Sequence, residues 1–176
     1  MRIIGGIYKG RILCPFENIG VRPTSDMTRE SLFNILRDKV CGARFLDLFS
    51  GTGAVAIEAL SRGAGSVTAN DSGRDAISLI KKNLEKLKIQ KSIEVTFYDA
   101  LSFIDSINSS FDIIYVDPPY TSGIYEKLLL GIHKIMDNGG IAVFESEKPI
   151  EYLPDNLIKY DQRKYGRAYL TFYKKE

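Results

Sequence analysis

The tetrapeptide Asp117-Pro118-Pro119-Tyr120 follows an apolar run, 113–116, and carries the most specific chemistry in the chain. Two consecutive prolines fix the backbone and remove two N–H donors. The Asp117 carboxylate and the Pro118 carbonyl can therefore face one site as paired acceptors. Two acceptors match the two protons of a nucleobase's exocyclic amine, and Tyr120 offers a ring on which that base can stack, typically worth about 1–3 kcal/mol. The tetrapeptide predicts a site for a base amine.

A glycine loop, Gly51-Thr52-Gly53, begins the pattern G-x-G-x-x-A at the start of a predicted helix. Glycine allows the backbone to pass close to a ligand because no side chain intervenes. Asp71 lies 18 residues after Gly53, where its carboxylate is placed to accept hydrogen bonds from ribose hydroxyls. Asp99 follows the next predicted strand, within reach of a base edge. Together these residues predict a nucleoside-bearing cofactor.

Two cofactors fit this loop, NAD and S-adenosylmethionine. NAD directs a pyrophosphate at the helix N-terminus, whereas S-adenosylmethionine has no phosphate and carries a sulfonium and an ammonium group. Asp47 lies four residues before Gly51, inside a predicted strand, where an anion is costly without a partner. A cation suits that carboxylate and a pyrophosphate does not. The sequence therefore favours S-adenosylmethionine, with an NAD-dependent oxidoreductase as the alternative.

Apolar runs alternate with helical periodicity and predict the elements that position these residues. Strands are expected at 45–49, 66–70, 93–97, 113–116, 141–144, 158–164 and 168–173, and helices at 24–39, 54–62, 74–88, 101–107 and 125–136. Asn138-Gly139-Gly140 is expected to end the last helix, and residues 2–13 to form a short hairpin. The pattern predicts an α/β fold: a mostly parallel seven-stranded sheet with helices on both faces, plus the short N-terminal hairpin and helix. Ligands of such folds bind beyond the carboxyl ends of the strands.

Length and composition are those of one globular domain. The 176 residues are 44% hydrophobic and 26% charged, which excludes disordered and fibrous classes. No run of 18 apolar residues and no secretory signal pattern occurs, so we expect a cytoplasmic protein without a membrane partner. Two cysteines, Cys14 and Cys41, are too few for a disulfide framework or a zinc site. We expect reduced thiols, no metal and a monomer.

The net charge of +2 is unevenly distributed along the chain. Residues 1–29 carry +3 and residues 159–176 carry +4, which leaves −5 for the middle. If the two ends meet in space, they form a positive patch that neutralises phosphates; solvated basic ends are the other interpretation. The candidate phosphate contacts are the basic residues Arg2, Lys9, Arg11, Arg22, Arg29 and Arg167.

The tetrapeptide at 117–120 resembles the catalytic motif of amino-directed S-adenosylmethionine methyltransferases, and the segment 47–53 resembles their cofactor loop. The resemblance implies that Phe49 and Ser50 also contact the cofactor, together with Ser72 and Ala100, which follow Asp71 and Asp99. Adenine-N6 DNA enzymes and glutamine-N5 protein enzymes share the tetrapeptide. The motif therefore indicates the chemistry and leaves the substrate open.

The chain as a whole is similar to the bacterial RsmD family, which methylates N2 of a guanine in 16S ribosomal RNA. The similarity lies in the segments 2–6, 10–11, 22–24, 29–36 and 165–167. It implies a single Rossmann-like class I methyltransferase domain, with an RNA-binding extension at 1–40 that includes Thr24 and a catalytic core at 41–176. The implied partner is 16S ribosomal RNA within an assembling small ribosomal subunit. Asp71 departs from the glutamate that the family more often carries.

The resemblance also implies a mechanism. A flipped or unpaired guanine enters beside Tyr120, and Asp117 with the Pro118 carbonyl holds its N2 so that the nitrogen lone pair faces the methyl donor. The same chemistry acting on DNA adenine or protein glutamine, and a non-catalytic RNA-binding module, remain as alternatives. His133, between Ile132 and Lys134 in a predicted helix, is interpreted as structural, and Tyr115 as a core residue.

Overall fold

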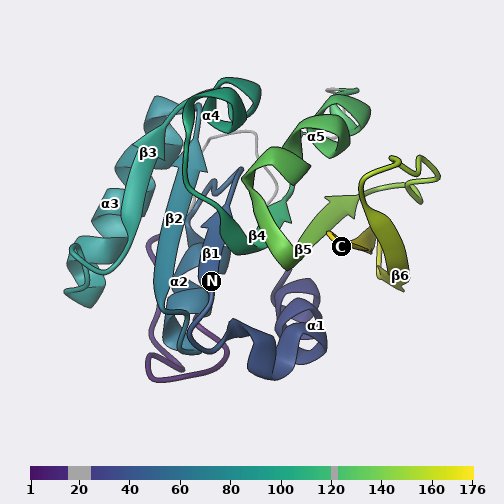
Figure 1. Cartoon of the computed structure of the whole chain (residues 1–176). Coiled ribbons are helices and arrows are strands. Elements are labelled where there is room, and N and C mark those ends of the chain that lie inside the picture. The colour runs from purple at the N-terminus through teal and green to yellow at the C-terminus, as the bar shows by residue number, and fades with distance from the viewer. Residues whose placement is uncertain (16–24, 120–122) are drawn as a thin grey trace.

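The computed structural model describes residues 1–15, 25–119 and 123–176. Its body is one seven-stranded sheet in the order β3-β2-β1-β4-β5-β7-β6 (Figure 1). The strands are β1 (Arg44–Asp47), β2 (Ser66–Asp71), β3 (Glu94–Phe97), β4 (Phe111–Val116), β5 (Met136–Ser146), β6 (Ile158–Tyr165) and β7 (Ala168–Lys174). β1 to β5 pair in parallel, and β7 pairs antiparallel to both β5 and β6. The predicted mostly parallel sheet is confirmed.

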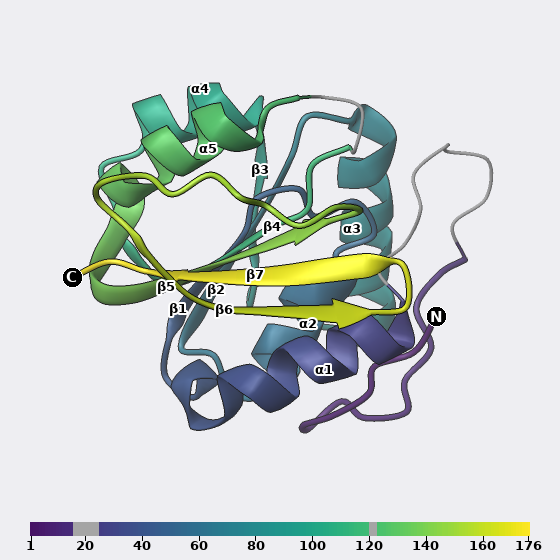
Figure 2. The ribbon, with the colours of Figure 1, turned by 90° about the vertical axis from the view of Figure 1, so that its right-hand side faces the viewer.

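Helices cover both faces of this sheet. They are α1 (Asp26–Leu36), α2 (Ala54–Ser61), α3 (Arg74–Leu87), α4 (Ala100–Ser106) and α5 (Tyr125–Ile132), with 3-10 turns η1 (Arg37–Val40) and η2 (His133–Ile135). α1, α2 and α3 pack into one hydrophobic core, and α4 and α5 into the other. Figure 2 shows α4 and α5 above the strands and α1 and α2 below them. None of the helices in the described part of the chain is long and apolar enough to cross a membrane.

The boundary between α5 and β5 differs from the prediction. The helix ends at Ile132, and β5 already begins at Met136, which pairs with Phe111 of β4. The predicted helix stop at 138–140 is therefore wrong. Gly139 N donates to the carbonyl of Lys175 at 2.9 Å, and Lys175 N donates to the carbonyl of Gly140 at 3.0 Å. These bonds attach the glycines to the chain end, so the segment continues the sheet.

The N-terminal segment 1–13 forms a short hairpin-like loop that lies on α2. A single antiparallel bridge joins Arg2 and Ile12. Gly6 has a φ of +73°, and a Cβ there would lie 1.8 Å from the Ser61 carbonyl oxygen. Only glycine fits such a contact, which fixes how closely the segment approaches α2. The expected hairpin is therefore present as one bridge with turns, and it belongs to the packing of the domain.

Helix α1 begins at a side-chain cap. The Ser25 hydroxyl accepts a hydrogen bond from Thr28 N at 3.0 Å, as an N-cap does. Leu32, Phe33 and Leu36 point into the core. The Phe33 ring stacks on Phe45 of β1 with 6.0 Å between the centroids, which holds α1 against the sheet.

Candidate active site

The acceptor pair predicted after β4 lies at the carboxyl edge of the sheet, between β1 and β5. Asp117 and Pro118 directly follow the buried end of β4, with Asp117 partly exposed and Pro118 buried. Asp47, the last residue of β1, is in register with Tyr115 of β4, so the loops that follow the two strands leave the sheet side by side. Tyr120 lies outside the described residues.

Asp47 is a buried carboxylate at the end of β1. Its Oδ2 accepts a hydrogen bond from Ala56 N at 3.1 Å, whereas Oδ1 has no hydrogen-bond partner among the described residues. Burial raises the pKa of Asp47 to about 7, and the negative charge of Asp71 acts in the same direction. A buried acceptor without a donor costs roughly 1–3 kcal/mol. A cationic group placed here would satisfy both the oxygen and the charge.

The glycine loop leaves space at its first glycine. Gly51 has a φ of +50°, and a Cβ there would meet nothing within 4 Å, so the backbone faces open space. Gly53 has a φ of +75°, and its Cβ would lie 3.2 Å from Ile80 Cγ1 of α3. Gly53 N donates to the Ser50 carbonyl at 2.7 Å, which closes the turn before α2. The loop therefore exposes its backbone to a ligand while packing tightly against α3.

Asp71 joins the loops that follow β1 and β2. Its Oδ2 accepts from Gly51 N and its Oδ1 from Gly73 N, both at 2.8 Å. Each carboxylate oxygen keeps a further lone pair for a ligand hydroxyl. Asp99 instead caps α4, because its Oδ1 accepts from Leu101 N at 3.1 Å and from Ser102 N at 3.2 Å. Both predicted carboxylates thus lie at the carboxyl edge.

The remaining predicted cofactor residues differ in exposure. Phe49 is partly exposed and Ser72 is exposed, whereas Ser50, Thr52 and Ala100 are buried. The Ser50 hydroxyl donates to the Asp47 carbonyl at 3.0 Å, so it acts within the loop.

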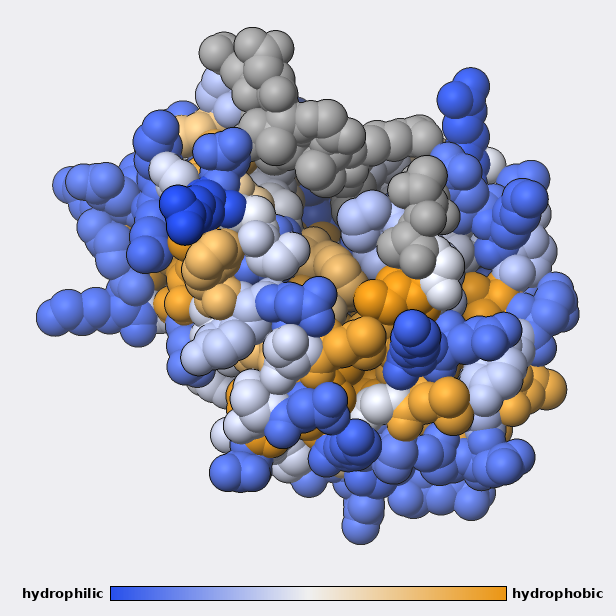
Figure 3. Space-filling view, turned by 90° about the horizontal axis from the view of Figure 1, so that it is seen from above, coloured by the Kyte–Doolittle hydropathy of each residue, from blue (hydrophilic) through white to orange (hydrophobic). Residues whose placement is uncertain are grey.

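Figure 3 looks onto the end of the molecule where α4 and α5 lie and shows apolar surface toward the middle, with hydrophilic residues around it.

Asn70, which sequence reasoning missed, holds the loops after β1 and β3 in place. Its buried side chain donates to the carbonyls of Leu48 at 3.2 Å and Tyr98 at 3.1 Å and accepts from the Thr96 hydroxyl at 2.9 Å. One amide thereby ties together Leu48 and Tyr98, the chain neighbours of Asp47 and Asp99. The available signal is an asparagine at the end of an apolar strand, directly before Asp71.

A group of tyrosines and carboxylates lies beside Asp117. The Tyr115 hydroxyl donates to the Glu145 carboxylate of β5, and the Tyr125 hydroxyl donates to the Glu145 carbonyl at 3.3 Å. Burial raises the pKa of Tyr125, and the charges of Asp117, Glu145 and Glu147 raise it further. Tyr125 therefore stays protonated and remains a hydrogen-bond donor near the predicted base site. Tyr115 is buried, as the sequence predicts.

The predicted phosphate contacts separate into surface and core residues. Arg2, Lys9 and Arg11 are exposed on the N-terminal segment, and Arg167 is exposed at the β6–β7 turn. Arg11 lies over the Tyr8 ring at 5.3 Å and donates to the Leu87 carbonyl at 3.2 Å. Two further predicted contacts, Arg22 and Thr24, lie outside the described residues.

The prediction that Arg29 contacts phosphate is wrong, because its side chain is buried. Its side chain is 1% exposed and pairs with Asp26 at 3.0 Å. It also donates to the Arg2 carbonyl at 2.6 Å. A phosphate on the surface cannot reach a guanidinium enclosed in this way. Arg29 stabilises the contact between α1 and the N-terminal segment, and it is not an RNA contact in this structure.

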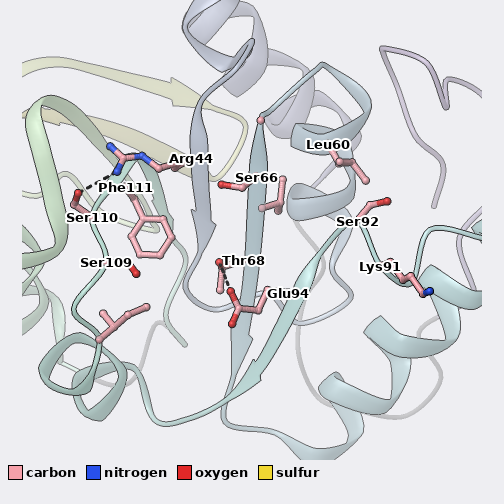
Figure 4. Close-up of a pocket in the computed structure, with 13 residues that line it drawn as sticks. Arg44, Leu60, Ser66, Thr68, Lys91, Ser92, Glu94, Ser109, Ser110 and Phe111 are labelled. Atoms are coloured by element: carbon pink, nitrogen blue, oxygen red, sulfur yellow. Dashed lines mark hydrogen bonds between the residues drawn. The ribbon is translucent and has the colours of Figure 1, made fainter.

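A separate hollow of about 640 Å³ opens at the opposite edge of the sheet (Figure 4). Its walls come from β2, β3 and the residues before β4. On the paired strands β2 and β3 the Thr68 hydroxyl donates to the Glu94 carboxylate at 3.5 Å, and Arg44 donates to the Ser110 hydroxyl at 3.3 Å. None of the predicted site residues lines this hollow, so it is distinct from the candidate active site.

Comparisons with known proteins show the family to which this chain belongs. A family model described as "Conserved hypothetical protein 95" matches residues 1–174. The chain belongs to this family. It is 34% identical to "Ribosomal RNA small subunit methyltransferase D" of Escherichia coli (strain K12), covering 100% of this chain and 90% of that protein. The protein of the same name from Haemophilus influenzae is also 34% identical, over 89% of this chain and 84% of its own length. The RsmD resemblance is thereby confirmed.

Solved structures agree with these sequence relatives. "Putative methyltransferase yhhF from Escherichia coli" superposes with a TM-score of 0.89 at 32% identity and covers 100% of this chain and 98% of its own. The strand order and the full-length superposition confirm the Rossmann-like class I methyltransferase fold that the sequence predicts.

Proposed function

We propose that this chain transfers a methyl group from S-adenosylmethionine to the exocyclic N2 of a guanine in 16S ribosomal RNA. The observation that carries the proposal is the position of Asp117 and Pro118, directly after β4 and beside the glycine loop of β1. The full-length similarity to proteins named ribosomal RNA small subunit methyltransferase D supports this substrate class.

The residues present suit S-adenosylmethionine. Asp47 offers a buried carboxylate oxygen that has no hydrogen-bond partner in the described part of the chain, which a cationic ligand satisfies. Gly51 exposes its backbone to open space, and Asp71 keeps lone pairs for ribose hydroxyls. Asp99, exposed after β3, is the proposed contact to the base of the cofactor. When bound, S-adenosylmethionine supplies an electrophilic methyl group.

Asp117 and Pro118 act on the nucleophile. An aromatic amine is a poor nucleophile because its lone pair is delocalised into the ring. Hydrogen bonds from the two N2 protons to the Asp117 carboxylate and the Pro118 carbonyl turn the nitrogen toward a tetrahedral geometry, with its lone pair aimed at the methyl carbon. Holding two reactants in such a geometry can contribute about 7–11 kcal/mol to lowering the barrier. As the nitrogen gains positive charge its proton becomes acidic, and Asp117 is positioned to accept it.

RNA contacts surround this site in the proposed arrangement. Tyr120 stacks on the target base, and residues 1–40 serve as an RNA-binding extension of a single domain whose catalytic core is 41–176. The proposed phosphate contacts are Arg2, Lys9, Arg11, Arg22, Thr24 and Arg167, which position RNA without reading its sequence. We further propose a cytoplasmic monomer that acts on RNA within an assembling small ribosomal subunit.

Labelled methyl transfer tests the proposal. Purified protein is incubated with tritiated S-adenosylmethionine and 16S ribosomal RNA from a strain that lacks the corresponding gene. Wild-type protein is expected to label the RNA, and Asp117→Ala to lower the rate by at least about 100-fold while cofactor affinity is kept. Asp105→Ala, which removes an exposed carboxylate paired with Lys134, is the matched control and should retain full activity. Full activity of Asp117→Ala would overturn the assignment.

A further inference from the structure

Two adjoining surface hollows run along the outer side of α1. One lies between α1 and β6 and is lined by Arg37, Arg163 and Tyr165. The other lies between α1, the end of α2 and the N-terminal segment and is lined by Arg37 and Arg62. Asn34 and Arg37 belong to both hollows, so they form one continuous depression, here called the α1 groove.

The residues that line the α1 groove carry more basic than acidic side chains. Three guanidinium groups line it, those of Arg37, Arg62 and Arg163, against the single carboxylate of Asp38. Arg62 and Arg163 have carboxylate partners at 2.8 Å, Glu58 and Asp161 respectively. Arg37 forms no ion pair with any residue in the described ranges, and its Nε donates to the Asn34 carbonyl at 3.3 Å. The planar fork of arginine matches the geometry of a phosphate group.

The backbone of Arg37 is strained. It has a φ of 45° and a ψ of −127° at the end of α1, a conformation that glycine adopts and other residues rarely do. Within the described residues only Arg37 and Lys88 combine a side chain with a positive φ. Such strain persists where the surrounding structure imposes it, and it concentrates at functional sites. An arginine at this position points to a use for its side chain outside folding.

The start of α1 lies at the edge of the molecule that carries Asp117, and the α1 groove follows along the second half of the helix and past its end. Tyr169 of β7 pairs with Ser146 at the carboxyl end of β5, so the β6–β7 turn lies at that edge. A Cβ on Gly166 in this turn would lie 3.7 Å from Met27 Cε, at the start of α1. From there α1 extends for 11 residues, about 16 Å. Figure 2 shows the turn beside α1.

We infer that the α1 groove, which extends along α1 between the N-terminal segment and β6, binds the sugar–phosphate backbone of the substrate RNA. This inference rests on the proposed function. A strand whose base lies beside Asp117 continues past Arg167 and along α1, where Arg37 and Arg163 contact its phosphates. Arg163 and Arg167 of the basic C-terminal segment thereby act on the same RNA strand as Arg37.

Binding of unmethylated 16S ribosomal RNA transcript at 50–200 mM KCl tests the inference. The variant is Arg37→Gly/Arg163→Ala, measured by filter binding against wild type. Each lost phosphate contact should weaken affinity roughly five- to tenfold at 0.1 M salt and make the slope of log Kd against log salt shallower by about 0.7–0.9. Affinity for S-adenosylhomocysteine should not change, because the groove lies outside the proposed cofactor site.

A glycine control separates this effect from misfolding. Arg37→Gly should leave the thermal midpoint unchanged or raise it, since glycine relieves the positive φ. Lys88→Gly makes the same change at the end of α3, beside the β3 edge of the sheet (Figure 1), and should leave RNA affinity unchanged.

Each outcome supports or overturns a defined part of the account. A double variant with wild-type affinity and salt slope overturns the groove, and so does an equal loss of affinity in Lys88→Gly. If wild type methylates the RNA in those cases, the proposed function stands. A wild-type protein that methylates neither this RNA nor the RNA of small ribosomal subunits overturns the proposed function, and the groove with it.

Discussion

Arg29 of α1 and Glu58 of α2 face each other in the interior, with 3.7 Å between the guanidinium Nε and the carboxylate Oε2. The Glu58 carboxylate also accepts hydrogen bonds from Ile4 N at 2.8 Å and Gly5 N at 2.7 Å, and Arg62 Nε lies 2.8 Å away. One buried carboxylate therefore joins α1, α2 and the N-terminal segment. It sets the position of the exposed Arg2, Lys9 and Arg11 relative to the domain.

Glu58→Gln should destabilise the fold. The amide nitrogen cannot accept a hydrogen bond, so one of the two N–H groups of Ile4 and Gly5 loses its acceptor, and Arg29 loses its buried counter-charge. Breaking one partner of a buried pair typically costs about 3–5 kcal/mol, which corresponds to a drop in thermal midpoint of roughly 6–20 °C for a domain of this size. Thermal unfolding measures this drop in the midpoint. The matched control, Glu30→Gln at an exposed position of α1, should shift the midpoint by less than about 2 °C; equal midpoints for the two variants would contradict the role of Glu58.

Asp47→Asn should change the pH dependence of stability. Burial raises the pKa of Asp47 from 3.8 to about 7, so between these pH values the folded protein holds a proton that the unfolded chain releases. Stability conferred by this group therefore falls as pH rises from about 4 to about 7. The variant should unfold at a higher temperature than wild type at pH 8 and at nearly the same temperature at pH 4, in the absence of cofactor. A difference that does not vary with pH would refute this.

Asp71→Asn should weaken cofactor binding. The substitution removes the charge and leaves one acceptor oxygen for the N–H groups of Gly51 and Gly73, so the loop after β1 loses an anchor and ribose loses a charged acceptor. We expect S-adenosylhomocysteine to bind at least about tenfold more weakly, corresponding to roughly 1.4 kcal/mol. Titration calorimetry measures this affinity for S-adenosylhomocysteine. Asp75→Asn, an exposed position in the first turn of α3, serves as the control, and an unchanged affinity in Asp71→Asn would exclude the ribose role.

Local patterns were sufficient to predict the sheet and the loops at its carboxyl edge. Asp117-Pro118 directly follows the apolar run at 113–116. Because proline has no N–H group to donate, it ends the strand there, so the position of this pair follows from the sequence. The G-x-G pattern at 51–53 likewise lies between a strand and a helix, as expected.

Partners distant in the sequence could not be predicted in this way. The burial of Arg29 depends on Glu58, and a charge count treats both as surface residues. A single carboxylate within the apolar helix 54–61 was the available signal. The glycines at 139–140 resemble a helix stop, but their backbone bonds to Lys175 place them in the sheet. Arg37 was missed because its strain belongs to the folded backbone.

Nucleoside mass analysis of the methylated RNA tests the central claim most directly. Unmethylated 16S ribosomal RNA, free or in small ribosomal subunits, is treated with wild-type protein and S-adenosylmethionine and digested to nucleosides. We predict one new product, N2-methylguanosine, absent when Asp117→Ala replaces wild type. N6-methyladenosine in its place, or no methylated nucleoside on either substrate, would contradict the account.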